Sequence, residues 1–133
     1  MKMDKKRILL VDDETDFVWL IKSRLEANNY DVCTASDGKG AIKKIKEEKP
    51  EAILLDIFIP GTNGLTILRM IRRYDKKVPI YVITASSDQQ KFIDAKKLGA
   101  SGFIMKTSNF QKEIDNITNV LHLSGKFRGP SDA

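Results

Sequence analysis

The chain has 133 residues, of which 41% are hydrophobic and 31% charged, and its formal net charge is +5. This length and balance suit one domain with a single core, and they exclude a disordered chain. One cysteine, Cys33, excludes a disulfide framework and a thiolate zinc site, and no apolar stretch is long enough for a signal peptide or a bilayer span. We therefore expect a cytoplasmic protein that does not bind a membrane. Because the excess lysines are spread over several helical segments, we also expect no direct binding to nucleic acid.

The first half of the sequence predicts two strand–helix pairs. Residues 8–11 form an apolar run that ends at Asp12 and Asp13, and branched runs of this length are typical of buried parallel strands. Residues 30–35 alternate in polarity, as an edge strand does. The buried faces of the two helices are marked by Phe17, Leu20, Ile21, Leu25, Ala41, Ile42 and Ile45.

Three more strand–helix pairs follow in the second half. The strands, each with the reactive residue at its end, are 52–55 with Asp56, 80–83 with Thr84 and 102–105 with Lys106. Ser87 with Gln90 and Ser108 with Gln111 are candidate capping boxes for the last two helices. The buried helix positions are Leu65, Leu68, Ile71, Phe92, Ile93, Ala95, Leu98, Phe110, Ile114, Ile117 and Leu121.

Five strands and five helices in strict alternation predict a right-handed, doubly wound α/β fold with a parallel sheet. We place the domain at residues 1–123 and expect residues 124–133, which are polar and contain glycine, to form a flexible tail or linker stub. Ligands of such sheets bind just beyond the carboxyl ends of the strands. The sequence therefore predicts that three carboxylates, one hydroxyl and one ammonium meet at one edge of the sheet.

The residue types at this edge suit phosphoryl transfer. Neighbouring carboxylates cannot all stay ionised unaided: either one of them takes up a proton, or a cation neutralises them. Hard oxygen ligands without histidine or cysteine favour Mg²⁺ as that cation. A lysine is superfluous for a metal alone and indicates an anion as well, so a carboxylate nucleophile would become an aspartyl phosphate. Taken singly, Asp12 or Asp13 could instead cap a helix, and Lys106 could be a solvated charge.

Four motifs resemble, in order, the signature of the receiver domain of bacterial response regulators. They lie at 8–14, 54–64, 82–85 and 103–106, and the resemblance covers nearly the whole chain. It implies a flavodoxin-like sheet of order 2-1-3-4-5 and a phosphorylation-driven switch of a two-component phosphorelay, which catalyses only its own phosphotransfer and autodephosphorylation. A sensor histidine kinase or a histidine phosphotransfer protein would be the donor, while the downstream effector and a phosphorylation-dependent dimer stay open.

The resemblance also implies a role for each reactive residue. Asp56 would accept the phosphoryl group from a phosphohistidine. Lys106 would pair with the phosphate, Thr84 would bond one of its oxygens, and Phe103 would turn inward as Thr84 moves. The implied ligands of Mg²⁺ are Asp12, Asp13, Asp56 and the backbone carbonyl of Phe58.

Three positions depart from the family pattern. Thr107 stands where the family usually has a proline after the lysine, which leaves the placement of Lys106 open. Phe58 is bulky, and we hypothesise that its ring partly screens the acyl phosphate from water. Phe103 lacks the hydroxyl that some relatives carry, so an inward turn would depend on packing alone. A phenylalanine at such a position is more often a core residue than a switch, and the sequence does not separate the two.

Val18 and Trp19 flank the inward face of the first predicted helix, which starts beside the acidic cluster. We interpret them as a docking patch for the phosphodonor, with partial burial against a neighbouring helix as the alternative.

The rival function is a small Mg²⁺-dependent aspartyl-phosphate phosphatase or phosphotransferase. Haloacid-dehalogenase-like enzymes of this kind carry a D-x-D pattern after the first strand and a cap domain. This chain has adjacent aspartates, its candidate nucleophile follows the third strand, and no residues are left for a cap. The receiver interpretation is therefore favoured.

Overall fold

The structure is a computed structural model that describes residues 5–59, 62–84, 89–106 and 109–128, with the backbone alone described at 58, 59, 62, 63, 110 and 123–128. Strands and helices alternate as predicted, and a short two-stranded ribbon is added after the third strand. The elements are β1 (Lys6–Val11), α1 (Thr15–Ala27), β2 (Tyr30–Ala35), α2 (Gly38–Glu48), β3 (Ala52–Asp56), β4 (Phe58–Ile59), β5 (Thr62–Asn63), α3 (Gly64–Tyr74), β6 (Ile80–Thr84), α4 (Gln89–Lys97), β7 (Gly102–Met105) and α5 (Phe110–Arg128).

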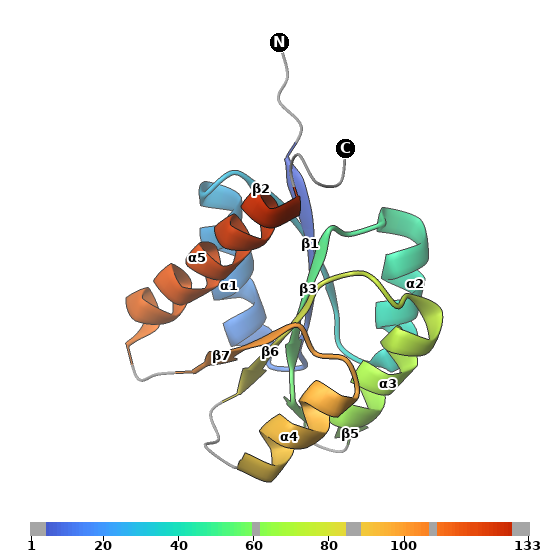
Figure 1. Cartoon of the computed structure of the whole chain (residues 1–133). Coiled ribbons are helices and arrows are strands. Elements are labelled where there is room, and N and C mark those ends of the chain that lie inside the picture. The colour runs from blue at the N-terminus through green and yellow to red at the C-terminus, as the bar shows by residue number, and fades with distance from the viewer. Residues whose placement is uncertain (1–4, 60–61, 85–88, 107–108, 129–133) are drawn as a thin grey trace.

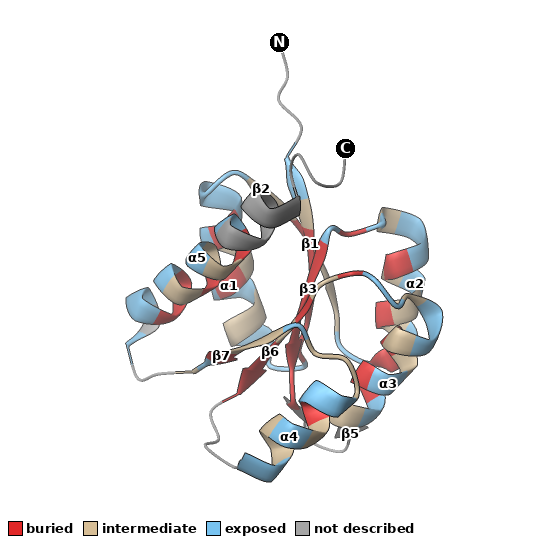
Figure 2. Ribbon diagram, viewed as in Figure 1, coloured by how far each residue is buried: buried red, intermediate tan, exposed pale blue. Residues whose placement is uncertain are grey.

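The main sheet has five parallel strands in the order β2-β1-β3-β6-β7, which confirms the predicted doubly wound fold. Helices α1 and α5 cover one face, and α2, α3 and α4 cover the other (Figure 1). All five residues of β3 are buried because this strand lies in the middle of the sheet and is covered on both faces (Figure 2). Among the described residues no helix is long and apolar enough to cross a membrane.

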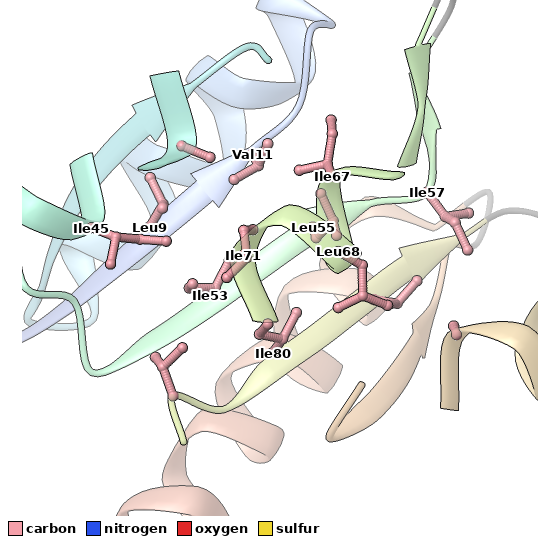
Figure 3. Packing of buried hydrophobic residues seen from close by; sticks show 14 residues of the cluster. Leu9, Val11, Ile45, Ile53, Leu55, Ile57, Ile67, Leu68, Ile71 and Ile80 are labelled. Atoms are coloured by element: carbon pink, nitrogen blue, oxygen red, sulfur yellow. The ribbon is translucent and has the colours of Figure 1, made fainter. Parts of the chain in front are cut away.

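Alternate residues of the central strands supply two separate cores. Leu9 and Val11 of β1 pack with Ile53 and Leu55 of β3 against α2 and α3, as Figure 3 shows. Ile8, Leu10 and Leu54 point to the opposite face and pack against α1 and α5. Burial on both sides fixes the strand register, since a slip of one residue would exchange the two cores.

Two residues predicted to be buried are exposed. Leu20 on α1 is 39% exposed and Ile93 on α4 is 47% exposed. On α1 the buried line runs through Phe17, Ile21 and Leu25, which are spaced four residues apart, so Leu20 falls to one side of it. A single helix against a sheet buries only this narrow line, which the apolar pattern alone does not locate.

The helix ends differ in part from the prediction. Asp37 caps α2 by accepting a hydrogen bond from the Gly40 N–H at 2.7 Å. At the start of α5 the side chain of Asn109 accepts one from the Lys112 N–H at 3.1 Å, whereas the predicted capping residues Ser87 and Ser108 lie outside the described residues. Helix α5 continues to Arg128, past position 123, and the domain boundary placed there stays a prediction.

Candidate functional site

The reactive residues lie where four neighbouring strands end. Asp12 and Asp13 follow β1, Asp56 and Thr84 are the last residues of β3 and β6, and Lys106 follows β7. Because β1, β3, β6 and β7 are adjacent and parallel, these ends meet at one edge of the sheet (Figure 1). The Lys106 N–H donates to the Thr84 carbonyl at 2.8 Å, which ties the end of β7 to the end of β6.

The Lys106 ammonium is the centre of the site. Its Nζ donates to Asp56 Oδ2 at 2.9 Å and lies 3.9 Å from Asp12 Oδ2. It also lies 4.2 Å from the ring centroid of Phe17, the third residue of α1. Burial lowers the pKa of Lys106, but the hydrogen bond and charge of Asp56 outweigh this and the net shift is upward. The ammonium therefore stays charged.

Asp12 carries an acceptor that lacks a hydrogen bond. Its Oδ1 accepts from the Glu14 N–H at 2.9 Å, while Oδ2 is buried and has no hydrogen-bond partner. Burial, and secondarily the charge of Asp56, raise the pKa of Asp12 to about 7. A buried carboxylate with an unused oxygen is costly, so the site favours a proton or a cation at this position.

This donor set fits Mg²⁺, which prefers oxygen ligands and takes few of them from the protein. Asp12 and Asp56 are 3% and 4% exposed, and Asp13 beside them is exposed to solvent. In the part of the chain that the structure describes, no three acidic, histidine or cysteine side chains already converge around one point. The Lys106 ammonium, which lies against both buried carboxylates, supplies the neutralising charge in this arrangement.

The two predicted switch residues, Thr84 and Phe103, lie on the same face of the sheet, because Phe103 pairs with Val82 and residues two apart in a strand share a face. Thr84 is 2% exposed. Phe103 is partly buried against the core under α3 and α4, and its ring meets Phe92 of α4 edge to face, with centroids 5.1 Å apart and planes at 72°. Phe103 is therefore packed between the sheet and α4.

The predicted docking residues separate in the structure. Val18 is half-buried and packs against the core under α1, whereas Trp19 is 66% exposed. A surface pocket beside Trp19 is lined by Thr15, Asp16 and Leu20 as well. Val18 is thus partly buried and Trp19 is exposed, and the docking role of Trp19 stays a prediction.

One functional contact was missed from the sequence. We assigned Phe17 to the buried face of the first helix, and it does pack there, but its ring also faces Lys106. Phe17 lies in the first turn of α1, which begins close to Asp13, but its contact with Lys106 depends on side-chain conformations that the sequence pattern does not give. The side chain of Phe58 and the residue Thr107 lie outside the described residues.

The model of the response regulator receiver domain matches residues 8–118. The chain belongs to this family. A relative in Bacillus subtilis, the alkaline phosphatase synthesis transcriptional regulatory protein PhoP, is 39% identical over 101 residues, which are 76% of this chain and 42% of that protein. The probable transcriptional regulator ycf27 of Guillardia theta is 34% identical over 122 residues, 92% of this chain and 48% of that protein. The receiver domain thus spans about half the length of the curated relatives it matches.

Solved receiver domains share the fold. That of a putative LuxO repressor protein from Vibrio parahaemolyticus is 27% identical, with a TM-score of 0.81 over 97% of this chain and 96% of that one. The receiver domain of NtrX from Brucella abortus is 28% identical, with a TM-score of 0.78 over 88% and 96% of the two chains. The family and the flavodoxin-like strand order implied by the sequence motifs are confirmed.

Proposed function

We propose that Asp56 is the phosphoacceptor of this receiver domain. Among the described residues, Asp56 is the buried carboxylate that accepts a hydrogen bond from the Lys106 ammonium, at 2.9 Å, and it stands at the end of the central strand β3. This contact is the observation that carries the proposal. An oxyanion that must accept a second anion needs a fixed positive charge next to it, and Lys106 supplies one.

The transfer is a displacement at phosphorus. An Asp56 carboxylate oxygen forms a bond to the phosphorus of a donor phosphohistidine, the phosphorus–nitrogen bond breaks, and its electron pair stays on the leaving imidazole. Lys106 moves from the carboxylate to a phosphoryl oxygen, because more negative charge collects there than on the carboxyl oxygens of the acyl phosphate. The Thr84 hydroxyl donates to another phosphoryl oxygen.

Asp12, Asp13, Asp56 and the backbone carbonyl of Phe58 would hold Mg²⁺. When bound, the ion neutralises the acidic cluster and the incoming phosphoryl oxygens. The unused Oδ2 of buried Asp12 supports this assignment, since it needs a cation or a proton. Asp13, which is exposed, would complete the ligand set from the solvent side.

Phosphorylation would shift a pre-existing equilibrium of the surface formed by α4, β7 and α5. As Thr84 moves to the phosphate, Phe103 would leave its packing against Phe92 and repack inward. Moving a switch from about 1% to about 99% takes about 5.5 kcal/mol of differential stabilisation. Two apolar side chains, Ile93 of α4 and Met105 of β7, are exposed on these elements and would be available to an effector or to a second copy of the domain.

The phosphodonor would be a histidine kinase or a histidine phosphotransfer protein that docks on α1. Trp19 offers an exposed apolar side chain next to a pocket, at the helix that begins beside the acidic residues. The relatives are named as transcriptional regulators, which favours an effector that controls transcription.

Incubation with Mg²⁺ and acetyl phosphate tests the proposed function. We expect one phosphoryl group per chain by intact mass, lost in Asp56→Asn and retained in the control Asp115→Asn, which changes an exposed carboxylate on α5. Steady multiple-turnover hydrolysis of several phosphate esters would instead support the phosphatase, and no phosphorylation of the wild-type chain would overturn both.

A further inference from the structure

Lys106 reaches its position across three strands. Its backbone follows β7, the outermost strand on one side of the sheet, and its N–H donates to the carbonyl of Thr84 at the end of β6. Its ammonium, in contrast, lies at Asp56 of β3. A four-carbon side chain that spans this distance loses most of its rotamer freedom. Because the carboxylate is changed when it is phosphorylated, a second group in contact with the ammonium would help to keep it at the site during transfer.

The ring of Phe17 is a second contact of the ammonium, and phosphorylation of Asp56 does not alter the ring chemically. Its centroid lies 4.2 Å from Lys106 Nζ, on the helix that follows β1, and Phe17 is fixed by packing against the core under α1 and α5. The face of an aromatic ring is negative and attracts an ammonium. It carries no net charge, so it does not compete with the phosphoryl oxygens for the ammonium.

We propose that Phe17 is a positioning residue for Lys106. It holds the ammonium over the phosphorylation site by a cation–π contact, both on the Asp56 carboxylate before transfer and on the phosphoryl oxygen after it. This inference rests on the proposed function of Asp56 and Lys106. The competing explanation is that Phe17 only fills the core under α1.

The phosphorylation rate separates the two explanations. With acetyl phosphate and saturating Mg²⁺, Phe17→Leu keeps an apolar side chain but removes the ring, and we expect the rate to fall about three- to thirty-fold. Phe17→Tyr keeps the ring face and should restore the rate to within about twofold of wild type. Tyr30→Leu is the matched control, because it removes an aromatic ring from the same core at the opposite end of the sheet, and it should leave the rate within about twofold of wild type.

A measurement of stability tests the contact without any phosphoryl transfer. In a double-mutant cycle of Phe17→Leu with Lys106→Met, urea unfolding should show non-additive effects, equal to about a two- to tenfold change in the unfolding equilibrium constant. The same cycle with Tyr30→Leu should be additive. If Phe17→Leu does not fold at the assay temperature, Phe17→Met is used in its place.

The outcomes are distinguishable. Failure of the wild-type chain to accept a phosphoryl group overturns the proposed function and leaves the stability cycle to judge the contact. A wild-type chain that is phosphorylated while Phe17→Leu reacts equally fast, or a cycle with Lys106→Met that is additive, overturns the positioning role and leaves the function of Asp56 standing.

Discussion

Two ion pairs of nearly equal length lie at opposite ends of the sheet. At the amino end, Arg7 of β1 lies 2.8 Å from Asp31 of β2, and their side chains are 41% and 44% exposed. At the carboxyl end, Lys106 lies 2.9 Å from Asp56, and their side chains are 18% and 5% exposed. The pairs therefore have similar nitrogen–oxygen distances and differ strongly in their exposure to water.

Solvation decides what each pair can do. Water screens the exposed pair and competes for its hydrogen bonds, so the sheet gains little from it. Burial offsets part of the attraction within the buried pair, and Asp12 adds a second carboxylate with an unused oxygen. A domain that keeps such a cluster is less stable than it could be, and it gains a site that responds strongly to an added cation or phosphoryl group.

The largest expected effect comes from removing the buried ammonium. Lys106→Met leaves Asp12 and Asp56 facing each other without a positive charge, so the free energy of unfolding at pH 8 should fall by about 3 kcal/mol. The loss should be smaller at pH 5, because Asp12 then takes up a proton. Urea unfolding of Lys106→Met and of Arg7→Met measures the loss in free energy of unfolding at each end of the sheet. Equal losses would contradict the conclusion that burial distinguishes the two ion pairs.

Magnesium should stabilise the folded chain by binding at the carboxyl ends of the strands and not at the Arg7–Asp31 pair. At a free Mg²⁺ concentration of a hundred times its dissociation constant, binding to the folded chain raises the free energy of unfolding by about 2.7 kcal/mol. Thermal unfolding with and without the ion measures this. Asp13→Asn should lose most of the effect and Asp31→Asn should keep all of it, whereas a gain that survives Asp13→Asn would place the ion elsewhere.

The pH dependence of stability should reveal the cost of the Asp12 charge. The pKa of Asp12 is raised to about 7 in the folded state, so between pH 4 and pH 7 the folded chain binds more protons than the unfolded one, and its stability falls as pH rises. Asp12→Asn removes this fall. We expect the variant to exceed wild type by about 1–3 kcal/mol at pH 8, with the excess vanishing near pH 4, and a constant difference across this range would show that Asp12 does not titrate there.

The smallest effect is expected at the amino end. Asp31→Asn weakens one acceptor of the Arg7 guanidinium, which also donates to the Glu48 carbonyl at 3.1 Å, and the side chains of Arg7 and Asp31 are open to water. The change in urea midpoint should be slight at low salt and absent in 1 M NaCl. A large, salt-resistant loss would mean that exposure does not distinguish the two pairs.

Much of this arrangement was predictable from the sequence. Branched apolar runs locate the strands, strict alternation with helices sets their direction, and parallel strands bring Asp12, Asp56 and Lys106 to one edge. What was not predictable depends on side-chain geometry. The exposure of Leu20 follows from which line of α1 touches the sheet, and the capping role of Asn109 follows from backbone geometry at the first turn of α5.

The contacts within the site were the least accessible. The apolar pattern places Phe17 in the core, but it does not show that Lys106, which follows the outermost strand β7, reaches its ring. Nor does it show which oxygen of Asp12 is left without a hydrogen bond. Both depend on the conformations of long or rotatable side chains, for which the periodicity of the sequence carries no information.

Locating the phosphoryl group tests the central claim most directly. After reaction with acetyl phosphate and Mg²⁺, peptide mapping by mass spectrometry should place one phosphoryl group on Asp56, the buried carboxylate that pairs with Lys106. A phosphoryl group on Asp12 or Asp13, or none on the wild-type chain, would contradict the account.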